Sequence, residues 1–310
     1  KRVQESWQGV REYLSNAFVS LNSPPILAVD VYQDTMLLGT GTELGDISVF
    51  DVEVTHRIPE TLRFYWRARS YDKYENGEWG TTLNGRSEVD SDSLPILYPD
   101  WQGRKLVTFS IDLNAPLTGM LFAPAMPVSL SRPVTMIYNQ ASDGTNDIAG
   151  LLLDPPLRGG ESYKVRSWVS HPTIVQLQMT PSDYPEWVTE QYLQVPEELS
   201  EQLATLVDQI TEYDQTAYEK TMAVTNFLRS EIEYQEIIIT PPENEDPIEW
   251  FLFYYRKGFC NYYATAEVLM LRSIGIPARL AMGYSQGVYV EQPTSNDTNE
   301  YSVYQRDSHA

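Results

Sequence analysis

Cys260 is the single cysteine of this 310-residue chain and its strongest candidate nucleophile. The spacing of Ala264, Val268 and Leu271 predicts a helix that begins at this cysteine. Unpaired backbone N–H groups and the helix dipole at such a start favour the thiolate, which is the reactive form of cysteine. Gly258 is expected to leave room for a substrate. A lone cysteine is more often a small buried hydrophobic residue, so its position alone leaves both interpretations open.

The histidines are the candidate partners of this thiol. His56 and His171 are isolated, whereas His309 ends a series of segments that begins just before Cys260. A lone histidine is usually structural, so the order of these segments carries more weight than any one of them. The segments are Gly258-Phe259-Cys260, Leu271-Arg272-Ser273-Ile274-Gly275-Ile276-Pro277-Ala278-Arg279, Gly283-Tyr284 and Arg306-Asp307-Ser308-His309-Ala310.

This series resembles the transglutaminase-like superfamily, which has a Cys at a helix N-terminus, a Leu-Arg-x-x-Gly-Ile-Pro-Ala-Arg stretch and a strand bearing His. The resemblance implies a papain-like Cys-His-Asp site in which Cys260 is the nucleophile and His309 the general base. The family's Asp follows on the next strand, in a Trp-x-x-x-Asp-Pro-Thr-like stretch that residues 1–310 lack. We therefore expect the domain to be truncated and inactive as it stands, and we do not assign Asp307 to the missing role.

The implied reaction is acyl transfer through a thioester on Cys260, which an amine or water then resolves. The developing oxyanion needs fixed hydrogen-bond donors. The backbone N–H of Cys260 is the first candidate, and Trp250, Asn261 or a tyrosine is a candidate for the second. Three functions stay open: a transglutaminase-like acyltransferase, a cysteine protease or amidase of the same superfamily, and a non-catalytic module that binds a component of the cell envelope.

The elements around this segment can be predicted from periodicity. Gly275 is placed to end the Cys260 helix, and strands are expected near residues 279–284 and 302–306. One upstream helix should begin near Pro196, and a second should span about 216–230. The apolar face of the first consists of Leu199, Leu203, Leu206, Val207 and Ile210.

Residues 26–180 show a different, two-residue period, as in Phe50, Val52 and Val54, with frequent turn residues. This pattern predicts an antiparallel β-sandwich, in which the Pro-containing stretch 124–133 forms an edge or a crossing loop. Residues 1–25 are expected to form a juxtamembrane or docking helix. The fold class is therefore α+β, with a β-sandwich over 26–180 followed by a transglutaminase-like domain over 181–310, in which helices pack on an antiparallel sheet.

Location and partners follow from a second resemblance, to bacterial membrane-anchored TgpA-type proteins. It implies the extracytoplasmic side of a bacterial membrane, with membrane helices outside this chain and a protein or peptide substrate at the envelope. The start at Lys1, without Met, fits a piece of a longer protein. The segments that carry this resemblance are Tyr65-Trp66-Arg67-Ala68-Arg69-Ser70-Tyr71-Asp72, Gly77-Glu78-Trp79, Tyr192-Leu193-Gln194-Val195-Pro196, Asp246-Pro247 and Phe251-Leu252.

Composition excludes other classes. The chain has 22 basic and 43 acidic residues and a formal net charge of −21, which repels nucleic acid. No stretch approaches the ~20 apolar residues of a membrane helix. We expect no cofactor and no metal, because residues 142–147 are too short for an EF-hand loop and are better explained as a turn.

Overall fold

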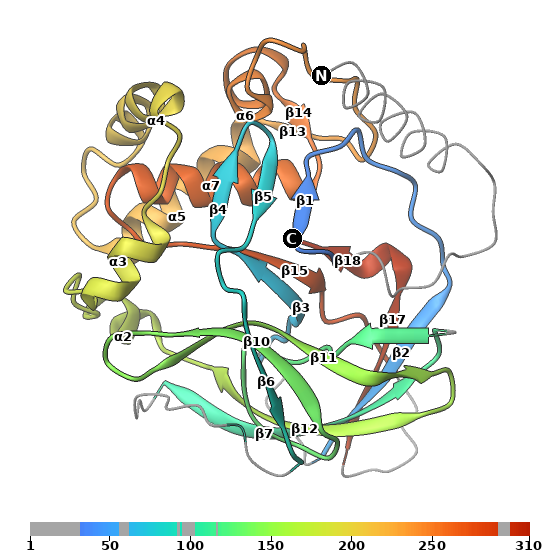
Figure 1. Cartoon of the computed structure of the whole chain (residues 1–310). Coiled ribbons are helices and arrows are strands. Elements are labelled where there is room, and N and C mark those ends of the chain that lie inside the picture. Colours follow the sequence, from blue (N-terminus) through green and yellow to red (C-terminus); the bar gives the residue numbers. More distant parts are fainter. Residues whose placement is uncertain (1–31, 56–61, 92–93, 95–102, 116, 291–297) are drawn as a thin grey trace, which may run out of the picture.

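The computed structural model describes residues 32–55, 62–91, 94, 103–115, 117–290 and 298–310. The helix expected within 1–25 and His56 lie outside these ranges. Two large antiparallel sheets form the lower part of the molecule as drawn in Figure 1, and helices cover one end of them. Among the described residues, no helix has the length and apolar character needed to cross a membrane.

The first sheet has six strands, and its central strands come from the region expected to form the sandwich. Its edge strand β9 contains Pro127, which agrees with the predicted edge position of the stretch 124–133. The strands are, in order across the sheet, β16 (Val288–Tyr289), β17 (Asn299–Tyr304), β2 (Ser48–Val54), β7 (Arg104–Leu113), β12 (Ser162–Ser170) and β9 (Met126–Leu130).

The second sheet has seven strands and carries the C-terminal end of the chain at its edge. The order is β18 (Ser308–His309), β15 (Leu280–Tyr284), β3 (Trp66–Tyr71), β11 (Asn146–Arg158), β10 (Val134–Gln140) and β6 (Gly85–Val89), with β8 (Leu117–Met120) also paired to β11. Two small sheets complete the strands, namely β1 (Thr35–Leu37), β5 (Glu78–Gly80) and β4 (Lys73–Glu75), and the parallel pair β13 (Glu233–Tyr234) and β14 (Lys257–Gly258).

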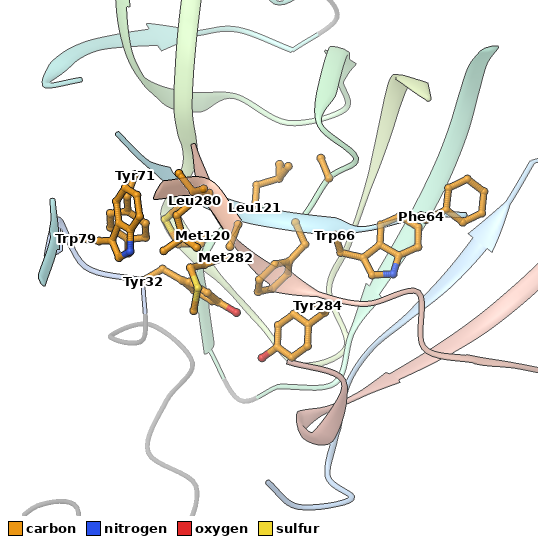
Figure 2. Close-up of a cluster of buried hydrophobic side chains, with 14 of the residues drawn as sticks. Tyr32, Phe64, Trp66, Tyr71, Trp79, Met120, Leu121, Leu280, Met282 and Tyr284 are labelled. Carbon is orange, nitrogen blue, oxygen red and sulfur yellow. The ribbon is translucent and has the colours of Figure 1, made fainter. Parts of the chain in front are cut away.

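Aromatic side chains fill the space between the two large sheets. Phe50 of β2 and Phe109 of β7 meet the edge of Trp66 from β3, with ring centroids 6.3 and 5.3 Å apart. Each such edge-to-face pair contributes about 0.5–1.5 kcal/mol beyond the area that it buries. Figure 2 shows Trp66 and Tyr284 in the buried cluster beside β3 and β15. This core fixes β15, and with it the neighbouring strand β18.

Strands from both ends of the chain are interleaved in these sheets. β15 pairs with β3, and β17 pairs with β2, so residues 280–304 extend the sheets built by residues 48–170. The boundary expected near residue 180 marks the change from strands to helices, but it does not separate two sheets. The α+β class with antiparallel sheets is confirmed.

Helix α7 (Cys260–Ser273) is the central helix, and its first residue is Cys260, as predicted. α4 and α5 pack against it, and the side chain of Trp79 in β5 donates a hydrogen bond of 2.8 Å to Thr265 of α7. Gly275 follows α7 with a φ of +81°, which confirms its predicted role at the helix end. The remaining helices are α2 (Ile174–Gln178), α3 (Glu186–Tyr192), α4 (Glu197–Ile210), α5 (Ala217–Glu231), α6 (Pro247–Glu249), the π-helix η1 (Trp250–Tyr255) and the 3₁₀ helix η2 (Gln305–Asp307).

Both upstream helices were predicted correctly. Leu199, Leu203 and Val207 of α4 are fully buried, as their helical spacing requires. α5 begins one residue after Thr216, whose side chain forms a capping box with Glu219. The sequence signal for this start is Thr216 together with its partner three residues later.

Candidate active site

The chain reaches Cys260 through a short fixed segment. Arg256 ends η1 in the left-handed conformation with a φ of 55°, and β14 then pairs in parallel with β13, in register Tyr234 with Gly258. Phe259 is extended and is the last residue before α7. The pairing of β14 with β13 therefore fixes the backbone at the start of α7 and places Cys260 beside Tyr234.

Gly258 has a different role from the one expected. A Cβ atom at this position would lie 2.6 Å from Cε2 of Phe251 and 3.0 Å from Cβ of Tyr262. The missing side chain thus lets η1 and the first turn of α7 approach each other in the core. The expectation that Gly258 leaves room for substrate is wrong, because protein side chains occupy that space.

His309 is placed by the edge of the seven-stranded sheet. It pairs with Gly283 of β15, and the preceding Asp307 accepts a backbone hydrogen bond of 2.8 Å from Ser285. The hydroxyl of Tyr65 donates to the carbonyl oxygen of His309 at 2.6 Å. Strand pairing and this phenol together hold the backbone of His309 in position.

Cys260 and His309 line the same pocket, which has a volume of about 340 Å³. The cysteine comes from the start of a helix and the histidine from the edge of a sheet, so only the tertiary fold brings them together (Figure 1). Cys260 is half-buried and His309 is exposed. The other lining residues are Thr225, Leu228, Arg229, Ile232, Tyr234, Tyr263, Ala264, Glu267 and Ala310.

The thiol is hydrogen-bonded by its neighbours. Its Sγ donates to Oδ1 of Asn261 at 3.4 Å, and the Tyr234 hydroxyl and the backbone N–H of Ala310 lie close enough to favour its thiolate form. Among the described side chains, the ring of His309 forms no hydrogen bond to this sulfur. In the resting structure, Cys260 and His309 therefore share a pocket without a hydrogen bond between their side chains.

Burial raises the pKa of the Cys260 thiol above its usual value, although hydrogen bonds from the backbone N–H groups of Ala310, Asn261 and Cys260 and from the Tyr234 hydroxyl oppose this. Our expectation of a lowered pKa is therefore wrong for the resting site, because the cost of desolvating the thiolate outweighs the favourable donors at the helix start. Although His309 is exposed, the protein atoms around its ring partly desolvate it and lower the pKa of the imidazole. Both groups are consequently neutral near pH 7, and the imidazole is free to accept a proton.

The oxyanion candidates occupy different surroundings. The backbone N–H of Cys260 lies close enough to the hydroxyl of Tyr234 to oppose the rise that burial causes in the pKa of that phenol. Asn261 presents its oxygen to the thiol, and its Nδ2 lies 4.0 Å from Sδ of Met36. Trp250 is buried and stacks on Tyr255 with ring centroids 4.2 Å apart, away from the residues that line the pocket.

Tyr234 and Tyr65 are the site residues that periodicity did not identify. Tyr234 follows the end of α5 in a two-residue strand, and its contact with Cys260 depends on the parallel pairing of β13 with β14. In the sequence, Tyr65 was singled out only as part of the segment that resembles the TgpA-type proteins. Its side chain lies close enough to Cys260 for the thiolate charge to raise the pKa of Tyr65, after the larger effect of burial.

Two further sequence interpretations can be compared with the geometry. The carboxylate of Asp307 accepts a hydrogen bond of 2.8 Å from the backbone N–H of Tyr304, so it caps η2. The first part of the stretch 142–147 forms the predicted turn, and its last two residues begin β11. Thr145 donates its N–H to Asp143 at 2.8 Å, and Gly144 has a φ of +86°. Within the described ranges, no cluster of three His, Cys, Asp or Glu side chains could hold a metal ion.

Comparison with known families gives two adjacent matches. Residues 17–174 match the TgpA N-terminal domain, and residues 204–310 match the transglutaminase-like superfamily. The first match alone covers more than half of the chain. The chain belongs to the TgpA family of transglutaminase-like proteins. Membership in this family confirms the resemblance deduced from the cysteine and histidine segments.

Two curated bacterial proteins have sequences similar to this chain. The "Uncharacterized protein YebA" of Bacillus subtilis (strain 168) is 27% identical over 268 residues, which are 80% of this chain and 35% of YebA. A "Protein-glutamine gamma-glutamyltransferase" of Pseudomonas aeruginosa is 24% identical over 303 residues, 94% of this chain and 40% of that protein. The chain thus spans less than half the length of these curated relatives.

The TgpA fold is also seen in crystal structures. The periplasmic domain of TgpA from Pseudomonas aeruginosa bound to ethylmercury superposes with a TM-score of 0.59 at 22% identity, over 90% of this chain and 89% of that one. A second structure of that periplasmic domain gives a TM-score of 0.57 at 21% identity, over 91% and 88% of the two chains. These similarities establish the shared fold.

Proposed function

We propose that this protein performs thiol-dependent acyl transfer on carboxamides of proteins or peptides, with Cys260 as nucleophile and His309 as general base. The observation that carries the proposal is the common pocket of about 340 Å³, into which α7 places the cysteine and β18 the histidine. The printed name of the Pseudomonas aeruginosa relative, a protein-glutamine gamma-glutamyltransferase, supports the carboxamide as the acyl donor.

In the first half-reaction, the neutral imidazole of His309 accepts the proton of the Cys260 thiol. Sγ attacks the carboxamide carbon, so that an S–C bond forms and the carbonyl oxygen takes up negative charge. The imidazolium then returns the proton to the departing nitrogen, the C–N bond breaks, and ammonia leaves. A thioester on Cys260 remains. The second half-reaction repeats these steps with an amine as nucleophile and the thiol as leaving group.

The attack requires a small rearrangement of the resting thiol. Its proton is directed at Asn261, so the S–H bond must rotate toward His309 when substrate enters. Within the described part of the chain, no carboxylate is hydrogen-bonded to the His309 ring, and Asp307 already caps η2. We therefore propose that residues 1–310 alone are inactive and that an orienting acid completes the site in the active protein.

The oxyanion is stabilised by two donors in this proposal. The backbone N–H of Cys260 and the hydroxyl of Tyr234 now interact with each other beside the sulfur. A substrate oxygen that enters between them receives both hydrogen bonds, because the phenolic proton can turn from the sulfur to the oxyanion. Removal of one such donor lowers kcat by about 10²–10³-fold in other acyl-transfer enzymes.

Hydrolysis is the second candidate, and the exposure of the site favours it. His309 is exposed and Cys260 is half-buried, so water can reach a thioester in this pocket as an amine does. A protease or amidase would use the same acylation step, and the choice of acceptor separates the two activities.

We place this activity on the extracytoplasmic side of a bacterial membrane, attached by membrane segments outside the described residues. The support is the shared fold with a domain that is periplasmic in Pseudomonas aeruginosa. The substrate is then a protein or peptide of the cell envelope.

The test is a parallel measurement of both outcomes on the full-length protein. A labelled primary amine is supplied with a glutamine-containing peptide, and amine incorporation, ammonia release and peptide cleavage are followed. We expect incorporation with ammonia release, and loss of both in Cys260→Ala. Cleavage without incorporation would establish hydrolysis instead, and unchanged activity in Cys260→Ala would refute the proposed nucleophile.

A further inference from the structure

The pocket continues past the catalytic pair into the space between α5 and α7. Cys260, Ala264 and Glu267 lie on one face of α7, at positions i, i+4 and i+7, and all three line the pocket. Thr225 and Arg229, one turn apart on α5, line it from the opposite side. The reactive sulfur therefore stands at one end of a pocket that contains one carboxylate and one guanidinium.

Glu267 is held in a fixed position but lacks a counter-ion. Its Oε1 accepts a hydrogen bond of 2.6 Å from the hydroxyl of Thr225, and the side chain is half-buried. Of the ion pairs formed by described residues, none includes Glu267 or Arg229. Two opposite charges in one pocket thus remain available to a ligand.

Two hydrogen bonds establish the order of these groups along the pocket. Thr225 reaches Glu267, and the hydroxyl of Tyr263 reaches the carbonyl oxygen of Ile232 at 2.7 Å, so α5 and α7 run in opposite directions. Arg229 lies between Thr225 and Ile232 on α5. It is consequently closer than Thr225 to the end of the pocket that holds Cys260.

Resting on the proposed acyl transfer, we propose that the acyl acceptor is a diamino acid with a free α-ammonium and a free α-carboxylate. Its α-ammonium binds Glu267 and its α-carboxylate binds Arg229, while its distal amine attacks the thioester on Cys260. In that step the distal nitrogen forms a bond to the acyl carbon, the C–S bond breaks, and the amine proton passes through His309 to the sulfur. The product is an amide.

The dimensions of the pocket suit this class of acceptor. Seven residues of helix separate the Cα atoms of Cys260 and Glu267 by about 10 Å. The glutamate side chain points back toward the helix start and shortens the gap. An extended chain of five bonds, as between the distal nitrogen and Cα of lysine, covers roughly 6 Å. A simple alkylamine would fill the same space and leave both charges unpaired.

Four acceptors that differ only in the charges at their far end test the assignment: pentylamine, cadaverine, 6-aminohexanoate and lysine. Their incorporation into a glutamine-containing peptide is compared in full-length wild type, Glu267→Gln, Arg229→Gln and, as control, Glu212→Gln, an exposed change on the segment after α4. We expect lysine to have the lowest KM. Glu267→Gln should raise KM about tenfold for lysine and cadaverine only, and Arg229→Gln should do so for lysine and 6-aminohexanoate only.

The outcomes separate this inference from the proposed function. Equal KM values for the four amines in the wild type, or equal effects of each variant on all four, would overturn the acceptor assignment and leave acyl transfer intact. Failure of every amine, with peptide hydrolysis retained, would overturn both. The control Glu212→Gln should match the wild type with each acceptor.

Discussion

Replacement of Tyr234 by Phe removes one hydroxyl and keeps the ring. The ring is 55% exposed and contacts Tyr263 with centroids 5.7 Å apart, so the fold should lose less than about 0.5 kcal/mol of stability. The hydroxyl lies close enough to the Cys260 sulfur to stabilise the thiolate in the resting state. We propose that it donates to the oxyanion during acylation, and this second interaction determines the size of the effect.

The two interactions predict effects of different size in two assays. Loss of an oxyanion donor should lower kcat for ammonia release by about 10²–10³-fold, equivalent to about 2.7–4 kcal/mol. Loss of the resting interaction with the thiolate should remove about 1.5 kcal/mol of its stabilisation, because the site is only half-buried, so alkylation by iodoacetamide at pH 7 should slow by about tenfold. KM for the peptide should change little.

The matched control is Tyr254→Phe, because Tyr254 is 65% exposed on η1 and does not line the pocket. It should behave as the wild type in both assays. Equal slowing of acylation and alkylation in Tyr234→Phe would show that the tyrosine acts on the thiol alone. Unchanged acylation would refute its role in the oxyanion site.

Four further measurements have defined outcomes. Because burial lowers the pKa of His309, the imidazole in residues 1–310 should titrate by NMR with a midpoint below about 6.5; a midpoint above 7 would contradict this environment. Because burial raises the pKa of Cys260, the alkylation rate should reach its midpoint above pH ~8.5, and a midpoint near 6 would indicate a preformed thiolate–imidazolium pair. Tyr65→Phe removes the hydrogen bond to the carbonyl of His309, which contributes about 0.5–1.5 kcal/mol. This variant should reduce kcat/KM about 2–10-fold while its melting temperature changes little. Full activity would show that strand pairing alone holds the histidine. Gly258→Ala should lower the free energy of unfolding, measured in urea, by about 1–3 kcal/mol, because its Cβ would lie 2.6 Å from Phe251. The control Gly80→Ala, whose Cβ would have no atom within 4 Å, should lower it by less than about 1 kcal/mol.

Local elements could be predicted because their signals are local. The apolar spacing of α4 follows from burial of Leu199, Leu203 and Val207 on one face, and it is visible in the sequence without knowledge of the fold. The same holds for α7, whose start at Cys260 and end at Gly275 were both predicted. Periodicity also separated the strand-rich region from the helices.

Pairing between distant strands could not be predicted in the same way. The pattern of residues 279–284 indicates a strand, but it carries no information that β3 is the partner. Gly283, within this stretch, is needed for the pairing of β15 with β3, because a Cβ there would lie 2.0 Å from the carbonyl oxygen of Trp66. The interleaved sheets, and the position of Tyr234 beside Cys260, both depend on such non-local pairing.

The direction of the pKa shift at Cys260 also could not be predicted from the sequence. A helix start predicts a lowered thiol pKa, and the structure contains the expected N–H donors to Cys260. The opposing term is desolvation, which depends on how deeply the side chain lies in the pocket. Burial is a property of the assembled fold, and here it determines the direction of the shift.

The most direct test of the account is to isolate the acyl-enzyme. The full-length protein is mixed with a glutamine-containing peptide, quenched in acid within the first turnover, and analysed by mass spectrometry after proteolysis. We predict an adduct of the peptide less one ammonia on Cys260, which hydroxylamine removes and which Cys260→Ala does not form. An adduct on another residue, or turnover of the peptide with no adduct on Cys260, would contradict the assignment of this cysteine as the nucleophile.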